Sequence, residues 1–435
     1  MPASSRNTSE FLRRHHLNEA DLESLTQRLR AKAVPPTARI PGGARLSAES
    51  LDKRWRLLAS SAGMRATLAD AETVAAMERY QHNIENFIGT VKLPVGLAGP
   101  LRVNGLFAQG DFYVPLATTE AALVASYSRG AVAISEAGGC AAMLVSEGVS
   151  RAPGFAFRNI EEAGRFVVWA LAQQDAFRHV AEATTHHGRL VDIRFTLEGN
   201  HVYLILEFTT GSAAGQNMVT IATEAVCEYI REHTPVTPRY FFVEANLSGD
   251  KKASALSFMT VRGKKIVAEV SLSAVLVKRC LHTTPAMMVN YWRMSALGGV
   301  MSGTIGVQGH YANGLAALFI ACGQDAACVA ESAVGITRFE LAEDGGLYAA
   351  VTLPNIIVGT VGGGTALPSQ RACLEILGLA GPDHAEALAE VCGALALAGE
   401  LSIIAALSSN EFARAHRRLT RSKEAAQGMN LPPNS

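Results

Sequence analysis

Residues 190–232 read LVDIRFTLEGNHVYLILEFTTGSAAGQNMVTIATEAVCEYIRE, and this stretch decides the fold of the middle of the chain. Its short apolar runs and the turn residues between them predict a strand, a turn, a second strand and then a helix. These elements lie at 190–197, 198–200, 202–208 and 216–232. The glycine-containing loop GSAAGQN, residues 211–217, connects the second strand to the helix.

Two further elements flank this stretch, a helix over 159–182 and a strand over 239–243. The order helix-strand-strand-helix-strand is typical of an antiparallel sheet with helices on one face, of ferredoxin-like size. We therefore expect residues 153–242 to form a small α+β domain. It is inserted into a large mixed α/β domain made of residues 85–152 and 243–435.

The fold class that follows is α+β, with a polar helical arm ahead of the large domain over residues 1–84. Amphipathic patterns at 21–30 and 71–80 are the clearest helices of the arm. In the large domain we expect a hairpin over 253–275 and one long central helix over 283–306. The small residues of that helix permit close approach of its neighbours.

Composition excludes several classes of protein. The chain has 435 residues, more than one hydrophobic core normally serves, and 49% of them are hydrophobic. Lys and Arg together number 39, as do Asp and Glu, so no net charge draws the protein to nucleic acid or to anionic lipid. No N-terminal signal pattern is present, and polar residues or glycines interrupt each apolar stretch before spanning length. Seven cysteines without a Cys-x-x-Cys pair predict buried free thiols in the cytoplasm.

Four ionisable residues stand among apolar or small residues and could carry chemistry: Glu120, Lys251, Asp325 and His416. Each also has an ordinary explanation. Glu120 could belong to a capping box, Lys251 could be a solvated hairpin residue, and Asp325 could cap a helix. His416 could be part of a basic tail. Singly, none of the four decides between the two explanations.

Two glycine-rich loops could bind phosphate groups. GSAAGQN at 211–217 offers free backbone N–H groups and a helix dipole to a pyrophosphate, although an ordinary glycine-containing helix start has the same pattern. GTVGGGTALPSQRAC at 359–373 lacks the Gly-x-Gly-x-x-Gly spacing and any surrounding βαβ unit, so a Rossmann domain is not supported. The P-loop, serine-hydrolase and zinc patterns are absent as well, and we expect no metal.

Six segments in the same order resemble class I 3-hydroxy-3-methylglutaryl-coenzyme A (HMG-CoA) reductases, over about residues 85–423. They are ENFIGTVKLPVGLAGPL (85–101), ATTEAALVASYSRG (117–130), SGDKKAS (248–254), GHYANGLAALFIACGQDAA (309–327), GTVGGGTALPSQRACLEILG (359–378) and AGELSIIAALSSNEFARAH (398–416). The PVGLAGPL and ATTE wording resembles class I, without the membrane anchor of its animal and fungal members.

The resemblance implies catalytic roles for Glu120, Lys251, Asp325 and His416. Lys251 stabilises the oxyanion of the thioester, and His416 protonates the departing coenzyme A thiolate. Glu120, kept protonated by burial and by Asp325, supplies the proton for the second reduction.

The resemblance also implies binding residues. Those for the hydroxymethylglutaryl group are Arg151, Asn246, Asp250, Lys252, Asn313 and Gln324. Those for coenzyme A are Ser126, Arg129, His310 and Ser402. Those for the nicotinamide dinucleotide are Gly211, Ser212, Gly215, Asn217, His186 and Arg189.

The chain departs from the family pattern at the cofactor. Ser212, Ala214 and Gln216 replace the aspartate and methionines usual in that loop. The arginine expected at the 2′-phosphate is missing, which leaves His186, His187 and Arg189 as local cations. NADPH is expected and NADH stays possible. Near the substrate, His282 replaces a lysine and Glu244 a serine.

The resemblance implies reduction of HMG-CoA to mevalonate with two NAD(P)H in the mevalonate pathway that supplies isoprenoid precursors, by a soluble homodimer or dimer of dimers. Two alternatives stay open, NAD-dependent oxidation of mevalonate and a non-catalytic acyl-coenzyme A binding relative. The physiological direction and any regulation at Ser422 are left undecided.

Overall fold

The computed structural model describes residues 46–58 and 62–409, and of the first 45 residues only 10, 24, 27–31, 39–41 and 43. The chain divides into two compact units, Met1–Thr90 and Val91–Ser435. Half of the helix expected at 21–30 lies outside the described residues, as do His416 and Ser422. The expected three-part division of the chain stays a prediction.

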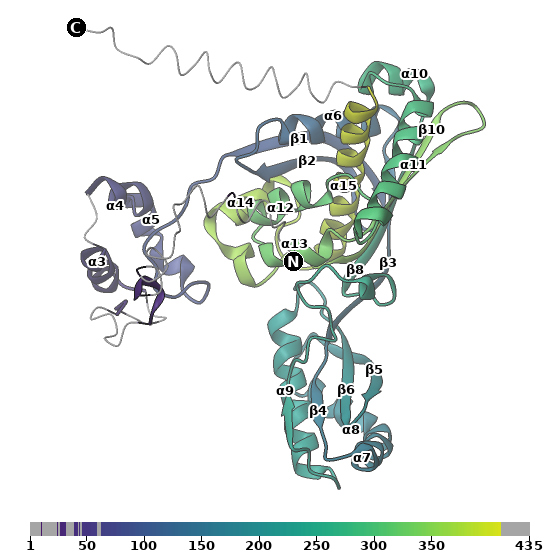
Figure 1. Cartoon of the computed structure of the whole chain (residues 1–435). Helices are drawn as coiled ribbons and strands as arrows, with labels where there is room; N and C mark the ends of the chain where they lie inside the picture. Colours follow the sequence, from purple (N-terminus) through teal and green to yellow (C-terminus); the bar gives the residue numbers. More distant parts are fainter. Residues whose placement is uncertain are drawn as a thin grey trace. The chain divides into compact units, whose positions relative to one another are not determined.

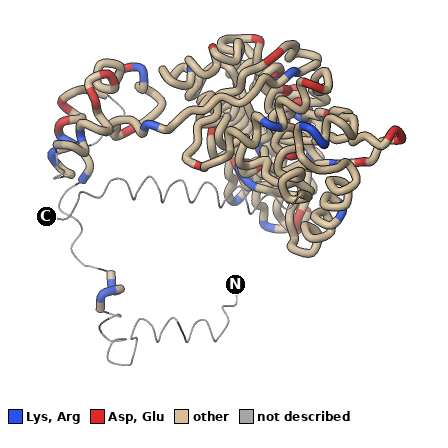
Figure 2. The backbone as a smooth tube through the Cα atoms, turned by 90° about the horizontal axis from the view of Figure 1, so that it is seen from above, with Lys and Arg blue, Asp and Glu red and all other residues tan. Residues whose placement is uncertain are grey.

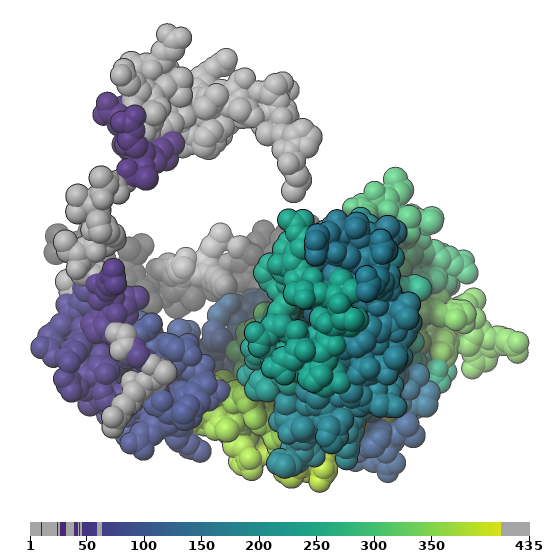
Figure 3. All heavy atoms as spheres, turned by 90° about the horizontal axis from the view of Figure 1, so that it is seen from below, coloured from purple at the N-terminus to yellow at the C-terminus, as the bar shows by residue number. Residues whose placement is uncertain are grey.

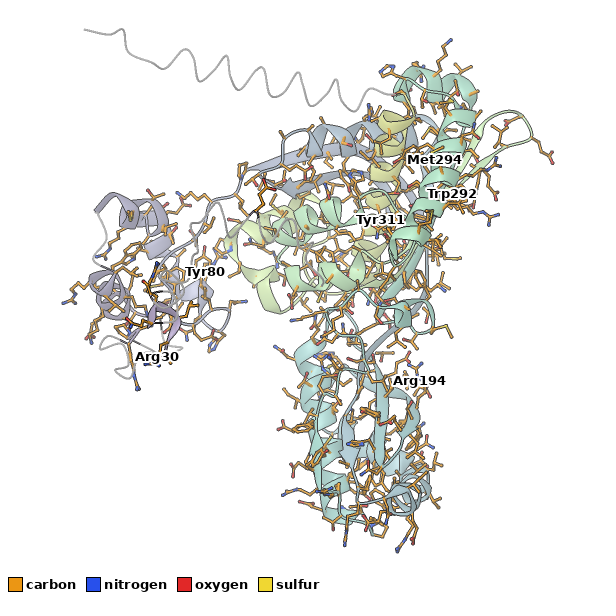
Figure 4. The ribbon with its side chains drawn as sticks, in the orientation of Figure 1. Arg30, Tyr80, Arg194, Trp292, Met294 and Tyr311 are labelled. Atoms are coloured by element: carbon orange, nitrogen blue, oxygen red, sulfur yellow. The ribbon has the colours of Figure 1, made fainter. Side chains whose placement is uncertain are left out.

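The described part of the first unit is a small helical bundle with its own core. Its elements are α3 (Ala48–Leu57), α4 (Ala62–Leu68), α5 (Ala71–Ala75) and the 3₁₀ helix η1 (Met77–Tyr80). Ser47 and Asp70 accept hydrogen bonds from Ser50 N and Thr73 N and so cap α3 and α5. In the core, the rings of Tyr80, labelled in Figure 4, and Phe87 stack with centroids 5.3 Å apart. The helix expected over 71–80 is thus α5 followed by η1.

The second unit is built on a sheet in which one long strand belongs to two parts. The strands of the larger part are β1 (Val95–Gly105), β2 (Gln109–Ala117), β3 (Cys140–Arg151), β8 (Gly263–Leu272), β9 (Ile336–Leu341) and β10 (Leu347–Ile356). The first part of β3 pairs with β8, and its last three residues pair with β6 (His201–Thr209). The strand therefore continues from the larger part into the smaller one (Figure 1).

Residues 154–242 form the smaller part, which we call the small lobe. It contains β4 (Gly154–Ala156), β5 (Arg189–Glu198), β6, β7 (Tyr240–Phe242), α7 (Ile160–Ala172), α8 (Gln174–Glu182) and α9 (Gln216–His233). Aromatic and aliphatic residues from its strands and helices form a hydrophobic core separate from that of the larger part. In Figure 3 this lobe, in blue-green and teal, presents one continuous surface. The predicted elements are present, but β4 was missed and the helix over 159–182 is two helices that meet at Gln173.

The larger part is organised around α15 (Ala385–Ser408), which packs against α6 (Leu123–Glu136), α11 (Pro285–Ser302) and α12 (Tyr311–Ala321) as well as the sheet (Figure 1). Two glutamates of α15 are fully buried. Glu390 accepts hydrogen bonds from the backbone N–H groups of residues 106–108 and 144, at 2.8–3.2 Å. These bonds satisfy a carboxylate that would otherwise be costly to bury.

Thr337 of β9 joins three helices of the larger part. Its carbonyl accepts from Trp292 Nε1 of α11 at 2.7 Å, and its hydroxyl bonds Tyr311 Oη of α12 at 2.6 Å and Glu400 Oε2 of α15 at 2.7 Å. Figure 4 labels Trp292 and Tyr311 beside one another. This hydrogen-bond cluster fixes α11 and α12 against the buried helix.

The remaining short helices carry loops of the larger part. They are η2 (Ala255–Phe258), α10 (Ala274–Leu276), the π helix η3 (Val277–Leu281), η4 (Ala326–Cys328), α13 (Val329–Ser332), η5 (Gly363–Ala366) and α14 (Pro368–Ile376). The hairpin expected over 253–275 is wrong, because η2 occupies its first half and β8 pairs with β3 and β10 instead. The long helix expected over 283–306 is the shorter α11, which Thr284 caps and Gly303 ends. Much of α11 is exposed, and the buried long helix is α15.

Helix α15 has the length and apolar composition of a membrane span. From the sequence we expected no stretch to be long and apolar enough. Within the described residues it is one such helix, and 83% of its most apolar window is buried inside the protein, as in the core helix of a globular domain. All seven cysteines are free and six of them are buried, which confirms the expectation of buried thiols. Acidic and basic residues are interspersed along the described chain (Figure 2).

Candidate active site

Lys251 lies in a tight loop between β7 and η2. The loop needs unusual backbone angles, with φ of 70° at Asn246, 72° at Gly249 and 56° at Lys251. Glu244 organises its first half, since its carboxylate accepts from Asn246 N at 2.7 Å and from Ser248 Oγ at 3.1 Å. Glu244, which replaces the serine usual in the family, therefore has a local structural role.

The ammonium of Lys251 is paired with the carboxylate of Asp325. Lys251 Nζ lies 2.8 Å from Asp325 Oδ2, and the two side chains are 39% and 41% exposed. The hydrogen bond that Lys251 donates to Asp325 raises the pKa of Lys251, against the smaller opposing effect of desolvation. Asp325 Oδ1 also accepts from Ala327 N at 3.0 Å and caps η4. Asp325 thus has both the capping role and the ion pair, and Lys251 is not a hairpin residue.

Asp250 and Arg151 lie beside this pair but below the surface. Arg151 is 7% exposed, and its guanidinium donates to Asp250 Oδ2 at 2.8 Å and to Thr220 Oγ1 at 2.9 Å. Lys252 Nζ donates to the carbonyl of Asp250 at 2.7 Å. These expected substrate residues are close together, although Arg151 is buried rather than open to a ligand.

Two buried residues that the sequence analysis missed complete this cluster. Arg262 NH1 pairs with Glu331 Oε1, and Arg262 NH2 lies 2.7 Å from Asp250 Oδ1. The Glu331 carboxylate also accepts from the backbone N–H of Lys251 at 3.0 Å. A glutamate within the apolar run CVAESAV was the available signal, because an ionisable residue is rarely buried unless it is paired.

Glu120 lies elsewhere in the chain. Both of its carboxylate oxygens accept from Asn313 Nδ2, at 3.0 and 3.2 Å, in the first turn of α12. Glu120 is exposed in the single chain, and α6 begins only at Leu123, so no capping box forms there. An α-helix rises ~1.5 Å per residue, so the ends of α12 lie about 16 Å apart. Within one chain, Glu120 is therefore remote from the pair of Lys251 and Asp325, which follows the other end of α12.

The residues expected at coenzyme A gather on the last turns of α15. Arg129 NH2 donates to Ser402 O at 2.7 Å, and the hydroxyls of Ser126 and Ser402 lie 2.9 Å apart. His310 Nε2 lies 2.8 Å from Gly399 O. Ser402 is fully buried, so it holds Arg129 and Ser126 rather than facing a ligand itself.

The loop 211–217 leads into the N-terminus of α9, an 18-residue helix without a side-chain cap. The N–H groups of its first turn can therefore receive an anion, which fits a dinucleotide pyrophosphate. Gly215 has φ of 75°, and a Cβ there would lie 2.1 Å from Thr210 Cγ2, so glycine is needed. Ser212 accepts from Thr360 N at 2.9 Å through its carbonyl and from Asp383 N at 2.8 Å through its hydroxyl, which fixes the loop against the larger part. Asn217 is exposed beside it.

The turn carrying the expected cations packs against the start of α9. Thr185 Oγ1 lies 3.0 Å from Met218 Sδ, which brings His186 and His187 near the glycine loop. Both histidines are exposed. The Arg189 guanidinium is paired with Glu182 at 2.7 Å, so it is already neutralised in part.

Gln324 serves the backbone in this structure. Its side-chain amide exchanges two hydrogen bonds with Gly359, at 2.8 and 2.9 Å, and so joins the loop before Asp325 to the glycine-rich loop at 359–364. Among the described residues no group of three or more His, Cys, Asp or Glu side chains could hold a metal ion.

Comparison with known proteins identifies relatives of this chain. The sequence profile described as hydroxymethylglutaryl-coenzyme A reductase matches residues 50–421. The 3-hydroxy-3-methylglutaryl-coenzyme A reductase of Pyrococcus horikoshii is 44% identical over 347 residues, 78% of this chain and 84% of that protein. The Aeropyrum pernix protein of the same name is 44% identical over 371 residues, 83% of this chain and 86% of that protein.

A solved structure shares the fold. The class II 3-hydroxy-3-methylglutaryl-CoA reductase from Streptococcus pneumoniae, bound to NADPH, gives a TM-score of 0.61 at 19% identity, covering 83% of this chain and all of that chain. At this identity the likeness concerns the fold alone, and it agrees with the mixed α and β architecture expected from the sequence.

Proposed function

The chain belongs to the hydroxymethylglutaryl-coenzyme A reductase family, and from that premise we propose which of its residues perform each step. The enzyme reduces HMG-CoA to mevalonate in the mevalonate pathway. One thioester, two hydrides and two protons give the primary alcohol and free coenzyme A. A bound nicotinamide supplies each hydride, and the protein must stabilise an oxyanion and provide protons.

Lys251 stabilises the oxygen of the thioester carbonyl while the first hydride arrives. The single observation that carries this role is its ion pair with Asp325 at 2.8 Å, because the raised pKa keeps the ammonium charged where negative charge develops. The pair is part-exposed, so a substrate can reach it.

His416 protonates the coenzyme A thiolate as it leaves, a task that suits an imidazole near neutral pH. Glu120 donates the proton to the oxygen of mevaldehyde in the second reduction. Support for its role comes from its bidentate contact with Asn313, which fixes the carboxyl group in an open position.

The binding residues are grouped as the roles require. Asn246, Asp250, Lys252 and Arg151 surround Lys251 and define the hydroxymethylglutaryl end, while Arg129, Ser126 and His310 lie near α15 at the coenzyme A end. In this proposal Ser402 and Gln324 act by positioning Arg129 and Gly359. Asn313 acts through Glu120.

The small lobe holds the cofactor, at the glycine loop and the first turn of α9. NADPH is the proposed cofactor, with weak discrimination against NADH, because the histidines at 186 and 187 and a partly neutralised Arg189 are the cations near this loop. The NADPH-bound relative supports a nicotinamide cofactor of either kind.

A site assembled from two copies of the chain best accounts for the separation of Glu120 from Lys251 along α12. We propose a homodimer or dimer of dimers in which Glu120 of one protomer joins Lys251 and Asp325 of the other. Class I membership is proposed as well, supported by the PVGLAGPL and ATTE segments and by 44% identity to archaeal reductases against 19% to the class II structure. A cytoplasmic location is supported by seven free cysteines.

The test is a spectrophotometric assay of NADPH and of NADH oxidation with HMG-CoA as substrate. The proposal expects two cofactors oxidised per HMG-CoA, mevalonate as product, and loss of activity in Lys251→Ala. Activity confined to mevalonate oxidation with NAD would favour the catabolic direction. Tight binding of HMG-CoA without turnover would favour the non-catalytic alternative.

A further inference from the structure

Lys251 is fixed at two points. Its side chain pairs with Asp325, and its backbone N–H is bound by a buried carboxylate. At φ of 56° the residue is in the left-handed region, which a lysine adopts only when its surroundings enforce it. The enforcing contact is the hydrogen bond from Lys251 N to Glu331 Oε1 at 3.0 Å. The next residue back, Asp250, is fixed through its carboxylate.

Four charges alternate beneath this loop. Glu331 pairs with Arg262, Arg262 lies 2.7 Å from Asp250, and Asp250 accepts from Arg151 at 2.8 Å. Glu331 is 0% exposed and Arg262 is 1% exposed, so neither can touch a substrate or a cofactor. Burial raises the pKa of Glu331, and Arg262 opposes that effect.

Such a cluster is not explained by stability alone. Apolar side chains of similar volume often stabilise a core as well as a buried ion pair does, because desolvating the charges is costly. What the cluster does provide is position, since the Arg262 guanidinium donates to Glu331 through NH1 and forms an ion pair with Asp250 through NH2. The cluster contacts two adjacent residues of the loop. Arg262 pairs with the side chain of Asp250, and Glu331 accepts from the backbone N–H of Lys251.

We propose that Glu331 and Arg262 are positioning residues, which fix the backbone of residues 250–251 and thereby set the place of the Lys251 ammonium against Asp325. The inference rests on the proposed role of Lys251. The proposed role explains why Glu331 and Arg262 form a buried ion pair although neither contacts the substrate. Small displacements of a reacting group matter here, because a shift of about 1 Å can reduce a rate by about 100-fold.

The direct test is Glu331→Gln, which keeps an acceptor for Lys251 N but removes the charge opposite Arg262. We expect kcat for HMG-CoA reduction to fall about 10- to 100-fold while the KM for NADPH changes little. The alkaline limb of the kcat profile should also move to lower pH. Asp325 is the main charge facing Lys251, with Cys328 and Asp250 beside it, so a displaced ammonium loses the bond that raises its pKa.

Two companion variants separate positioning from general damage. Arg262→Lys keeps the charge but replaces the two terminal nitrogens that face Glu331 and Asp250 with one compact ammonium, so it should show the same shift of the alkaline limb. Glu147→Gln is the matched control, because Glu147 also pairs with a buried cation, Lys264 of β8 at 3.0 Å, and not with a residue of the 244–252 loop. It should retain the wild-type pH profile. Circular dichroism and thermal unfolding confirm that each variant is folded.

The outcomes distinguish the inference from its premise. A folded Glu331→Gln or Arg262→Lys enzyme with wild-type kcat, or with reduced kcat and an unmoved alkaline limb, overturns the positioning role. Wild-type activity in Lys251→Ala instead overturns the proposed function of that lysine. Loss of activity in Lys251→Ala together with shifted profiles in both buried variants supports the two together.

Discussion

Asn313 and Asp325 lie at opposite ends of one helix and hold different members of the catalytic set. Asn313, in the first turn of α12, contacts Glu120, and Asp325, beyond the last turn, contacts Lys251. Helix α12 is buried on most of its length and spans about 16 Å, so we expect that the two groups do not meet within one chain.

Mixed dimers test this separation. Glu120→Gln and Lys251→Ala should each be inactive alone, yet co-expression of the two chains should recover about a quarter of wild-type activity, because half of randomly paired dimers are mixed and each carries one intact site. Activity of the unfractionated mixture measures this, and mixed dimers isolated through two different tags should reach about half of the wild-type activity per dimer. Absence of recovery in a demonstrated mixed dimer would show that the site is complete within one chain.

The ion pair between Lys251 and Asp325 predicts a pH effect. Asp325→Asn keeps the cap on Ala327 N but removes the charge that raises the pKa of Lys251. The ammonium should then lose its proton at lower pH, so the alkaline limb of kcat moves down and kcat at neutral pH falls by at least about 10-fold. In the wild type, the stabilisation that the pair gives the folded state should be present below the ordinary lysine pKa and lost as pH rises through the raised value. An unmoved limb contradicts the assignment.

Removal of the tail separates the two reductions. Helix α15 ends at Ser408, so truncation after Asn410 leaves every described element in place. We expect thioester reduction to be abolished and reduction of free mevaldehyde to be largely retained, because only the first reduction expels a thiolate. His416→Gln in the full chain is the finer variant and should behave alike. Equal loss in both reductions would reject the role of His416.

Cofactor choice should respond to the partner of Arg189. Glu182→Gln releases the guanidinium from its 2.7 Å ion pair, so the ratio of kcat/KM for NADPH over NADH should rise several-fold. Asp175→Asn, which breaks the similar pair with Arg178 on the same helix, is the control and should leave the ratio unchanged. A ratio independent of Glu182 would remove this ion pair from the cofactor site.

The sequence predicted most of the small lobe because its strands and helices are local patterns. The strands at 190–197 and 202–208 and the helix at 216–232 agree with β5, β6 and α9 to within one or two residues. The hairpin at 253–275 failed for the opposite reason. Its second half pairs with β3 and β10, strands far away in the chain, and no local pattern announces such pairing.

Only part of the candidate site could likewise be predicted from the sequence. Lys251 and Asp325 could be found from their motifs, but the burial of Glu331 and Arg262 depends on how α13 and β8 pack, which only the fold determines. The exposure of Glu120 could not be foreseen either, because two alanines and a leucine follow it in the sequence. No local sequence pattern predicts a contact between residues far apart in the chain, such as the hydrogen bond from the backbone N–H of Leu106 to the Glu390 carboxylate.

Helix α15 has a consequence for how the protein is made. It is synthesised after all the strands and helices of the larger part that pack on it, so their apolar faces emerge from the ribosome without a partner. The small lobe, whose core is continuous in sequence from 149 to 243, can fold well before that point. We expect nascent chains halted before residue 385 to protect the small lobe from protease while the larger part stays open to it and to chaperones.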